Sequence, residues 1–374
     1  MVPFHEAIQA HPETAGQPQT APREPWHEEL WAEPLPMPAT MRPVLFLVVD
    51  TEEEFDWNAR FSRQATRVTC IREVARLQAV TARYGVKPTY VIDYPIVTNP
   101  VAAGVFGALV AANVCTIGAH LHPWVNPPFL ETVCASNSYG CNLDPGLERR
   151  KIAALKEAIG DRLGIDARAY KAGRYGFGPS TARTLEALGF DVDLSVNPCM
   201  DFSADGGPSF AAMDARPSTF GRSRTLVEIP CSTGFVGMAR TAGRALHGLA
   251  STPVGARTRL PGVLARLGVL NKVMISPEGF TFDEMCALAS QLYADGVRTF
   301  SLTLHSPSLA AGHTPYAATA NDVDRLLATI DRFLEFFFDT LRGVPATPAD
   351  FHRQVSNVLG RQRRAPARQP HTVA

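Results

Sequence analysis

Short apolar segments alternate with segments of helical spacing along most of this chain. The run PVLFLVVD, residues 43–50, is almost continuously apolar, which is typical of a strand buried on both faces. Residues 68–84 follow it with apolar side chains at helical spacing, and Gly85 provides a stop. This alternation predicts an α/β protein built on a parallel sheet.

The same alternation continues almost to the end of the chain. Further strands are expected at PTYVID, CTIGA, RAYKAG, DVDLSV, TLVEIP, VMISP and TFSLTLH, in chain order. Helices are expected over residues 101–112, 147–163, 180–188, 281–296 and 321–341, and the Arg- and Gly-rich residues 237–270 are assigned only as helical. Seven or eight βα units with no linker between them predict a single distorted (β/α)7–8 barrel.

The two ends of the chain differ from this pattern. Residues 1–41 are rich in Pro, Glu, Gln, Thr and Ala and lack an apolar period, which predicts a flexible leader. Residues 346–374 are predicted to be a C-terminal segment that ends in a basic, flexible tail from about Gly360. The barrel is therefore expected to occupy residues 42–345.

Composition narrows the class of protein. The chain has 374 residues, of which 45% are hydrophobic, and its 36 basic residues balance its 36 acidic residues. A neutral balance disfavours binding to nucleic acid or to an anionic membrane. No stretch approaches the ~18 apolar residues of a transmembrane segment, and no export signal is present, which predicts a cytoplasmic location. The seven cysteines form no CxxC pair and are expected to be reduced thiols, and nothing in the sequence indicates the oligomeric state.

Polar side chains gather where the predicted strands end. Asp50 and Glu52 are spaced by two at the end of the first strand, and His120 and His122 have the same spacing after the third. The carboxyl ends of parallel strands meet on one face of a barrel, so these side chains are expected to converge. Two imidazoles and one carboxylate form the usual ligand set of a catalytic Zn²⁺. Glu52, His120 and His122 are therefore a candidate metal site.

Two further strand ends carry functional groups. His305 ends the last strand, which is expected to lie beside the first in a closed or nearly closed barrel. Lys171 and Arg174 flank the end of the strand RAYKAG, where two glycines would let backbone N–H groups approach a ligand. Each residue alone is more simply explained as a strand-end hydrogen-bonding group or part of a solvated loop. The clustering of all of them at one end of the strands favours a site.

The order of these motifs resembles that of the NodB-homology polysaccharide deacetylases. The motifs are Asp-x-Glu, GAHLH, YKAGRYG, FDVDLSV, VEIP and LTLHSPSL. The likeness is greatest to the WalW-like branch, whose genes lie among those for surface-polysaccharide assembly. It covers about residues 42–342, and the order of the motifs is more specific than any one of them. The resemblance implies a distorted barrel and metal-dependent removal of an N-acetyl group from a sugar.

The resemblance also implies a role for individual residues. Asp50 matches the catalytic base, and Glu52 matches the acidic metal ligand, which is more often Asp in the family. His120 matches the first metal histidine. His305 matches the histidine that acts as general acid, and Asp193 matches the carboxylate that tunes it.

This chain departs from the family pattern in three respects. The second metal histidine usually lies four residues after the first, where this chain has Trp124, so His122 must take its place or the metal site is altered. The arginine that orients the catalytic Asp falls at Lys171, with Arg174 as the alternative, and a lysine lacks the bidentate fork. Family members are usually exported or membrane-tethered, so the missing export signal favours a nucleotide-linked or lipid-linked sugar over a cell-wall polymer.

The sequence therefore predicts a hydrolase that acts on the amide C–N bond of an acetamido sugar and uses a divalent ion, with Zn²⁺ favoured. A backbone N–H near Tyr175 is expected to meet the oxyanion. Tyr175 and Trp124 are expected to offer apolar faces to the sugar ring, although Trp124 could equally pack the base of its loop. Two alternatives stay open. One is a metal-dependent amidohydrolase acting on a non-sugar amide, and the other is a catalytically silent carbohydrate-binding barrel.

Overall fold

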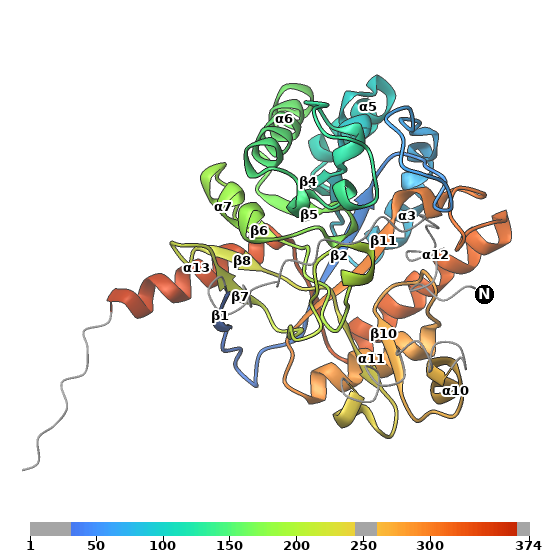
Figure 1. The fold of residues 1–374 in the computed structure, drawn as a ribbon. Helices are drawn as coiled ribbons and strands as arrows, with labels where there is room; N and C mark the ends of the chain where they lie inside the picture. The colour runs from blue at the N-terminus through green and yellow to red at the C-terminus, as the bar shows by residue number, and fades with distance from the viewer. Residues whose placement is uncertain (1–30, 244–259, 365–374) are drawn as a thin grey trace, which may run out of the picture.

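The computed structural model describes residues 31–243 and 260–364. The chain forms a curled sheet with helices packed around it (Figure 1). The strands are β1 (Trp31–Pro34), β2 (Val44–Thr51), β3 (Thr89–Ile92), β4 (Thr116–Leu121), β5 (Ala169–Ala172), β6 (Val192–Asp193), β7 (Ser218–Phe220), β8 (Leu226–Glu228), β9 (Thr233–Val236), β10 (Asn271–Met274), β11 (Thr299–His305) and β12 (Val344–Pro345).

The main sheet is mostly parallel and open. Its strand order is β1-β7-β8-β6-β5-β4-β3-β2-β11, with β12 also paired to β2, while β9 and β10 form a separate antiparallel pair. Strands β1 and β11 lie at opposite ends of this order and do not pair with each other, so the sheet of the described residues is open. It curls into a half-barrel (Figure 1). The predicted α/β barrel class is confirmed. The barrel is distorted in that its sheet is open.

Helices cover the sheet. The α-helices are α3 (Val74–Ala82), α4 (Tyr94–Thr98), α5 (Pro100–Ala111), α6 (Pro145–Leu163), α7 (Pro179–Ala187), α10 (Leu260–Arg266), α11 (Phe282–Ala294), α12 (Ala320–Glu335) and α13 (Pro348–Arg364). Shorter 3-10 turns are η1 (Thr69–Glu73), η2 (Pro123–Val125), η3 (Ser136–Ser138), η4 (Gly140–Asn142), η5 (Gly173–Tyr175), η6 (Ser203–Asp205), η7 (Arg240–Ala242) and η8 (Ser306–Leu309), and α12 continues as a π-helical turn, η9 (Phe336–Thr340).

Strand β2 occupies the centre of the fold. All eight of its residues are buried, as its continuous apolar run predicts. It pairs in parallel with β11 from Val44 to Asp50, with β3 over its second half and with β12 at its start. The strand that carries Asp50 is therefore held from both sides.

Local sequence signals explain several helix boundaries. Helix α11 begins with the capping box of Thr281 and Glu284, each of which bonds the backbone N–H of the other. Helix α6 ends at Gly164, which adopts φ 68° as a left-handed cap that glycine accommodates without strain. Phe333 and Phe337 at the end of α12 are fully buried, so the FLEFFF segment packs into the core.

Both ends of the folded region extend beyond the predicted barrel limits of 42 and 345. Strand β1 lies within the predicted leader and pairs with β7, with Trp31 opposite Phe220. Helix α13 lies within the predicted C-terminal segment and packs Phe351 edge-on against Phe46 of β2, with ring centroids 5.6 Å apart. Residues 1–30, 244–259 and 365–374, which include parts of the predicted leader, Arg-rich helices and basic tail, lie outside the described residues.

Two expectations about the whole chain can be compared with the structure. All seven cysteines are free thiols, as the absence of a CxxC pair predicts. Within residues 31–243 and 260–364, none of the helices combines the length and the apolar character that crossing a membrane requires.

Candidate active site

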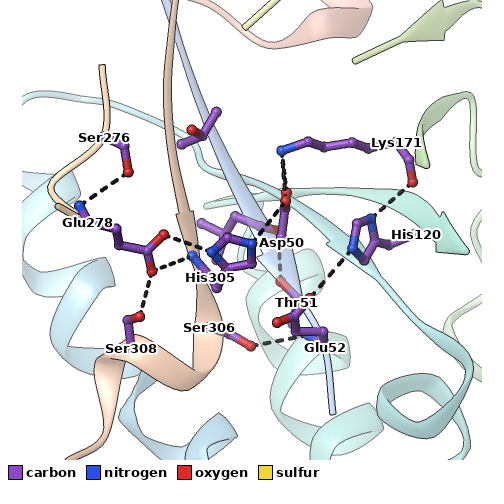
Figure 2. A network of polar contacts seen from close by, with 12 residues as sticks. Asp50, Thr51, Glu52, His120, Lys171, Ser276, Glu278, His305, Ser306 and Ser308 are labelled. Carbon is purple, nitrogen blue, oxygen red and sulfur yellow. Dashed lines mark hydrogen bonds and ion pairs between the residues drawn. The ribbon is translucent and has the colours of Figure 1, made fainter. Parts of the chain in front are cut away.

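Seven of the ten predicted site residues line one pocket at the carboxyl ends of β2, β4, β5 and β11, and Lys171, Trp124 and Asp193 do not. Figure 2 shows four of the seven, Asp50, Glu52, His120 and His305, close together. The pocket has a volume of about 70 Å³. Its polar lining consists of Asp50, Glu52, His120, His122, Arg174 and His305. Parallel strands bring these side chains together from segments far apart in the sequence, as expected for this architecture.

Asp50 lies between two cationic groups. The Nζ of Lys171 donates to both carboxylate oxygens of Asp50 at 2.7 Å, and Nε2 of His305 lies 3.7 Å from Oδ2. Burial alone would raise the pKa of Asp50, but the charges of Lys171, His120 and His305 outweigh it and lower the pKa. Asp50 is therefore an ionised carboxylate with a fixed orientation.

Lys171, and not Arg174, is the residue that orients Asp50. Lys171, on β5, makes that contact, and Figure 2 shows its side chain reaching across to Asp50. Arg174 instead donates to Ser138 at 2.6 Å and to Asp205 at 2.8 Å, so it holds the pocket rim. An arginine would bind the two oxygens of Asp50 with two separate N–H groups. A lysine lacks this planar guanidinium, so the single ammonium of Lys171 contacts both oxygens.

His305 is held by Glu278, not by Asp193. Its Nδ1 lies 2.7 Å from Oε2 of Glu278, and its backbone N–H donates to Oε1 of the same carboxylate at 3.0 Å. Burial alone would lower the pKa of His305, but the carboxylates of Glu278, Glu52 and Asp50 raise it to about 10. His305 is therefore protonated at neutral pH.

The predicted contact between Asp193 and His305 is wrong. The carboxylate of Asp193 accepts hydrogen bonds from the backbone and hydroxyl of Ser195, at 3.0 and 2.7 Å. The same hydroxyl accepts from the backbone N–H of Ala172, so Asp193 holds the end of β5 through Ser195. Asp193 also pairs in register with Glu228, and burial raises the pKa of both carboxyl groups.

Glu52, His120 and His122 form a compact group of potential metal ligands. Oε2 of Glu52 lies 3.7 Å from Nε2 of His120 and 3.3 Å from Nε2 of His122. The other nitrogens are occupied elsewhere, because Nδ1 of His120 lies 2.9 Å from the carbonyl of Lys171 and Nδ1 of His122 lies 2.7 Å from Oε2 of Glu53. This pattern fixes both Nε2 atoms towards Glu52, as in histidine metal sites.

Two further observations fit a cation at this position. Oε1 of Glu52 is buried and has no hydrogen-bond partner among the described residues. Burial lowers the pKa of His122, which favours the neutral imidazole that a metal requires. Two imidazoles and a carboxylate with an unpartnered buried oxygen suit a divalent ion such as Zn²⁺.

Glu53 supports this group from behind. Its carboxylate accepts from Trp124 Nε1 at 2.8 Å as well as contacting His122, and its backbone N–H donates to Asp93 at 2.7 Å. Trp124 is only 1% exposed and stacks on His122, with ring centroids 4.3 Å apart. The expectation that Trp124 offers a face to a sugar is therefore wrong, because it packs the base of the loop.

Backbone geometry next to the pocket is specialised. A Cβ on Gly173 would lie 2.4 Å from Cδ2 of His122, so only glycine allows β5 to approach this ring. Arg174 and Tyr175 both adopt positive φ, of 52° and 58°. Two successive left-handed residues without a glycine are costly, and such strain concentrates at functional sites. Tyr175 lines the pocket, as expected for a substrate-facing residue.

The sequence pattern missed several residues that support or line the site. Glu53 is adjacent to Glu52, and the alternation of a strand would point it away, but the chain turns after β2. Glu278 follows the expected strand VMISP directly, so the strand-end criterion could have selected it. Phe55, Trp57 and Phe61 also line the pocket, and their spacing carries no regular pattern.

Comparisons with solved structures identify the fold. An open, mostly parallel α/β half-barrel of this kind is the fold of the NodB-type deacetylases. PuuE allantoinase superposes with a TM-score of 0.52 and 16% identity over 90% of this chain and 98% of its own. A protein of Mycobacterium smegmatis assigned to the polysaccharide deacetylases superposes with a TM-score of 0.50 and 14% identity over 88% of this chain and 95% of its own. No protein-family model and no curated protein matches the sequence.

Proposed function

We propose that this protein is a metal-dependent hydrolase that removes the acetyl group from an acetamido sugar. The observation that carries the proposal is the convergence of three groups in one pocket: the ligand set of Glu52, His120 and His122, the ionised Asp50, and the protonated His305. Water activation, proton removal and proton delivery are the requirements of amide hydrolysis. The resemblance of the motif order to the NodB-homology family supports an N-acetyl substrate.

Asp50 acts as the base in this proposal. A divalent ion bound by Glu52, His120 and His122 would lower the pKa of a water molecule and polarise the amide carbonyl. Asp50 accepts the proton of the attacking water, and Lys171 keeps its carboxylate in one orientation. The lowered pKa of Asp50 makes it a weak base in isolation, so the pKa of the attacking water must also be lowered for Asp50 to take its proton.

His305 acts as the acid. Glu278 keeps its imidazole protonated and directs Nε2 towards Asp50 and the pocket. His305 donates this proton to the departing amine, so that acetate and an amino sugar are released. The backbone N–H of Tyr175 meets the developing oxyanion, which accounts for the strained conformation there.

The small volume of the pocket, about 70 Å³, favours a small or terminal acetamido group, such as that of a nucleotide-linked or lipid-linked sugar. Membership of the WalW-like branch and a cytoplasmic location remain predictions. The direct test is an acetate-release screen over N-acetylated sugar nucleotides, lipid-linked sugars and oligosaccharides, with and without a chelator. Chelator-sensitive acetate release supports the proposal. Absence of release from every substrate with Zn²⁺, Mn²⁺ or Co²⁺ added would leave the silent carbohydrate-binding barrel.

A second candidate is hydrolysis of a non-sugar amide. It is favoured by the fold shared with PuuE allantoinase at a TM-score of 0.52, because the same half-barrel there carries a protein named for a non-sugar substrate. Allantoin and related cyclic amides belong in the same screen. Turnover of these compounds without acetate release from any sugar would replace the first proposal by the second.

A further inference from the structure

Two buried carboxyl groups lie side by side on strands next to β5. Asp193 of β6 and Glu228 of β8 are register partners, both are fully buried, and their side chains are in hydrogen-bonding contact. They belong to the sequence motifs FDVDLSV and VEIP, to which the proposed mechanism gives no role. Two adjacent carboxylates repel each other in a buried site, so one of the two groups is expected to be neutral.

The ionisable groups near the pair do not supply a compensating positive charge. Tyr170 of β5 and Cys231 after β8 both influence the pair. Burial raises the pKa of the tyrosine and raises that of the thiol to about 11, so both groups are neutral at neutral pH. The ammonium of Lys171 is bound to Asp50. A proton held by the pair is therefore what removes one of its two negative charges.

Hydrogen bonds indicate which of the two groups has the proton. Both oxygens of Asp193 accept from Ser195, Oδ2 from the backbone N–H at 3.0 Å and Oδ1 from the hydroxyl at 2.7 Å, as suits a carboxylate. Glu228 accepts at Oε1 from the backbone N–H of Val196 at 3.1 Å. Its Oε2 is buried and has no donor among the described residues. A proton on Oε2 would give this atom a hydrogen bond to make, with Asp193 as the acceptor.

The pair is connected to the candidate active site through Ser195. The hydroxyl of Ser195 accepts from the backbone N–H of Ala172, at the end of β5, at 2.8 Å. The preceding residue is Lys171, whose Nζ binds Asp50. The carbonyl oxygen of Lys171 also lies 2.9 Å from Nδ1 of His120. The end of β5 therefore positions both the proposed base and a potential metal ligand.

We propose that Glu228 is a positioning residue that is protonated at neutral pH and donates a hydrogen bond from Oε2 to Asp193. This bond keeps Asp193 in the orientation in which it binds Ser195, and so fixes the end of β5 that carries Lys171. The proton on Glu228 does not depend on the proposed deacetylase function, whereas the effect of Glu228 on catalysis rests on that function.

The first test compares the pH dependence of urea unfolding in Glu228→Gln and wild type. Glutamine reproduces the neutral acid, because its amide oxygen can accept from Val196 and its NH2 group can donate to Asp193. The pKa of Glu228 is raised in the folded protein by burial and by Asp193, so the folded wild type keeps a proton that the unfolded chain releases, and its stability falls as pH rises. From about pH 6 to 8, the unfolding equilibrium constant of wild type should rise about tenfold more per pH unit than that of Glu228→Gln.

A matched control and a spectroscopic measurement identify the proton. Glu157→Gln removes the same charge from an exposed position on α6 and should follow wild type at every pH. The infrared difference spectrum between wild type and Glu228→Gln at pH 7 should contain the carbonyl band of a neutral carboxylic acid. Parallel pH dependence of the two proteins without that band would overturn the proposal.

The third test compares the two carboxyl groups. Asp193→Asn directs an NH2 group at a donor of Ser195, so it should raise the unfolding constant at pH 7 at least about fivefold, whereas Glu228→Gln should not raise it. A Glu228→Gln protein that does not fold, or that is less stable than Asp193→Asn, would contradict a neutral Glu228.

The positioning role is tested by rescue. On an acetamido substrate, Glu228→Ala should lower kcat about tenfold or more, and Glu228→Gln should restore kcat to near the wild-type value. Equal values of kcat in the Ala and Gln variants would overturn the positioning role. If wild type hydrolyses no acetamido sugar, the proposed function fails, while the unfolding and infrared results still decide whether Glu228 has the proton.

Discussion

His305 lies directly beside Asp50 on the neighbouring parallel strand. The two residues are register partners in the β2–β11 ladder, and Nε2 of His305 lies 3.7 Å from Oδ2 of Asp50. Each side chain is also held from its outer side, Asp50 by Lys171 and His305 by Glu278 (Figure 2). The separation of the proposed base and acid is therefore set by the backbone hydrogen bonds of two buried strands.

Replacing Glu278 should move the pH dependence of activity. The carboxylate of Glu278 is the largest influence that keeps the pKa of His305 at about 10 against its burial. In Glu278→Gln, burial remains and the pKa falls, so His305 loses its proton at a lower pH. The alkaline limb of a kcat/KM profile should shift to lower pH by more than about one unit. Ser308→Ala removes a hydroxyl that donates to Glu278 but keeps the carboxylate, so its limb should stay near that of wild type. An unmoved limb in Glu278→Gln would contradict the assignment of His305 as the acid.

Removing Lys171 should destabilise the protein through Asp50. Lys171→Met leaves a buried carboxylate without its ammonium, which costs about 3–5 kcal/mol in free energy of unfolding. The pKa of Asp50 should then rise, because burial is no longer outweighed. The double variant Asp50→Asn/Lys171→Met should lose much less than the sum of the single variants in urea unfolding. Additive losses would show that the two side chains do not depend on each other.

Asp50→Asn alone should retain metal but lose turnover.

Removing His122 should deplete the bound metal. His122→Ala leaves only Glu52 and His120, so metal measured by elemental analysis after dialysis should fall at least tenfold. His352→Ala is the control, since this half-buried histidine on α13 contacts the carbonyl of Thr225, away from the pocket. A His122→Ala protein with full metal content and full hydrolysis would refute His122 as a ligand.

Truncating Phe351 should destabilise the barrel. Phe351 on α13 is 2% exposed and packs edge-on against Phe46 of β2. Phe351→Ala should lower the free energy of unfolding by about 3–5 kcal/mol, measured by urea denaturation. Arg353→Ala, on the exposed side of the same helix, should change it by less than about 1 kcal/mol. Equal stability of Phe351→Ala and wild type would mean that α13 does not stabilise the barrel, in agreement with the predicted end of the barrel at residue 345.

The central strands could be predicted because their own residues determine them. The run from Val44 to Val49 is apolar throughout, which is typical of a strand buried on both faces. Strands β1, β7 and β12 are short and contain no such run, so their pairing depends on partners distant in sequence. Local propensity contains no information about those partners, so the sequence pattern did not indicate the pairing of β1 with β7 or the packing of α13 on β2.

The site was partly predictable for a related reason. Spacing by two after a buried strand places side chains on one side, which selected Asp50 with Glu52 and His120 with His122. Trp57 reaches His305 from a loop whose course the sequence pattern does not specify. Glu278, which also contacts His305, directly follows the expected strand VMISP, so the same criterion could have selected it. Asp193 ends a strand as the others do, but its carboxylate turns to Ser195. A strand end thus predicts proximity to the site but not the direction of the side chain.

The position of β2 bears on how the chain is synthesised. Its partner β11 belongs to the last third of the sequence, so a growing polypeptide exposes one edge of β2 until that part leaves the ribosome. An uncovered apolar edge is prone to pair with other chains. Prematurely terminated products that end before Thr299 should therefore aggregate, and efficient production in a foreign host should depend on chaperones that shield nascent strands.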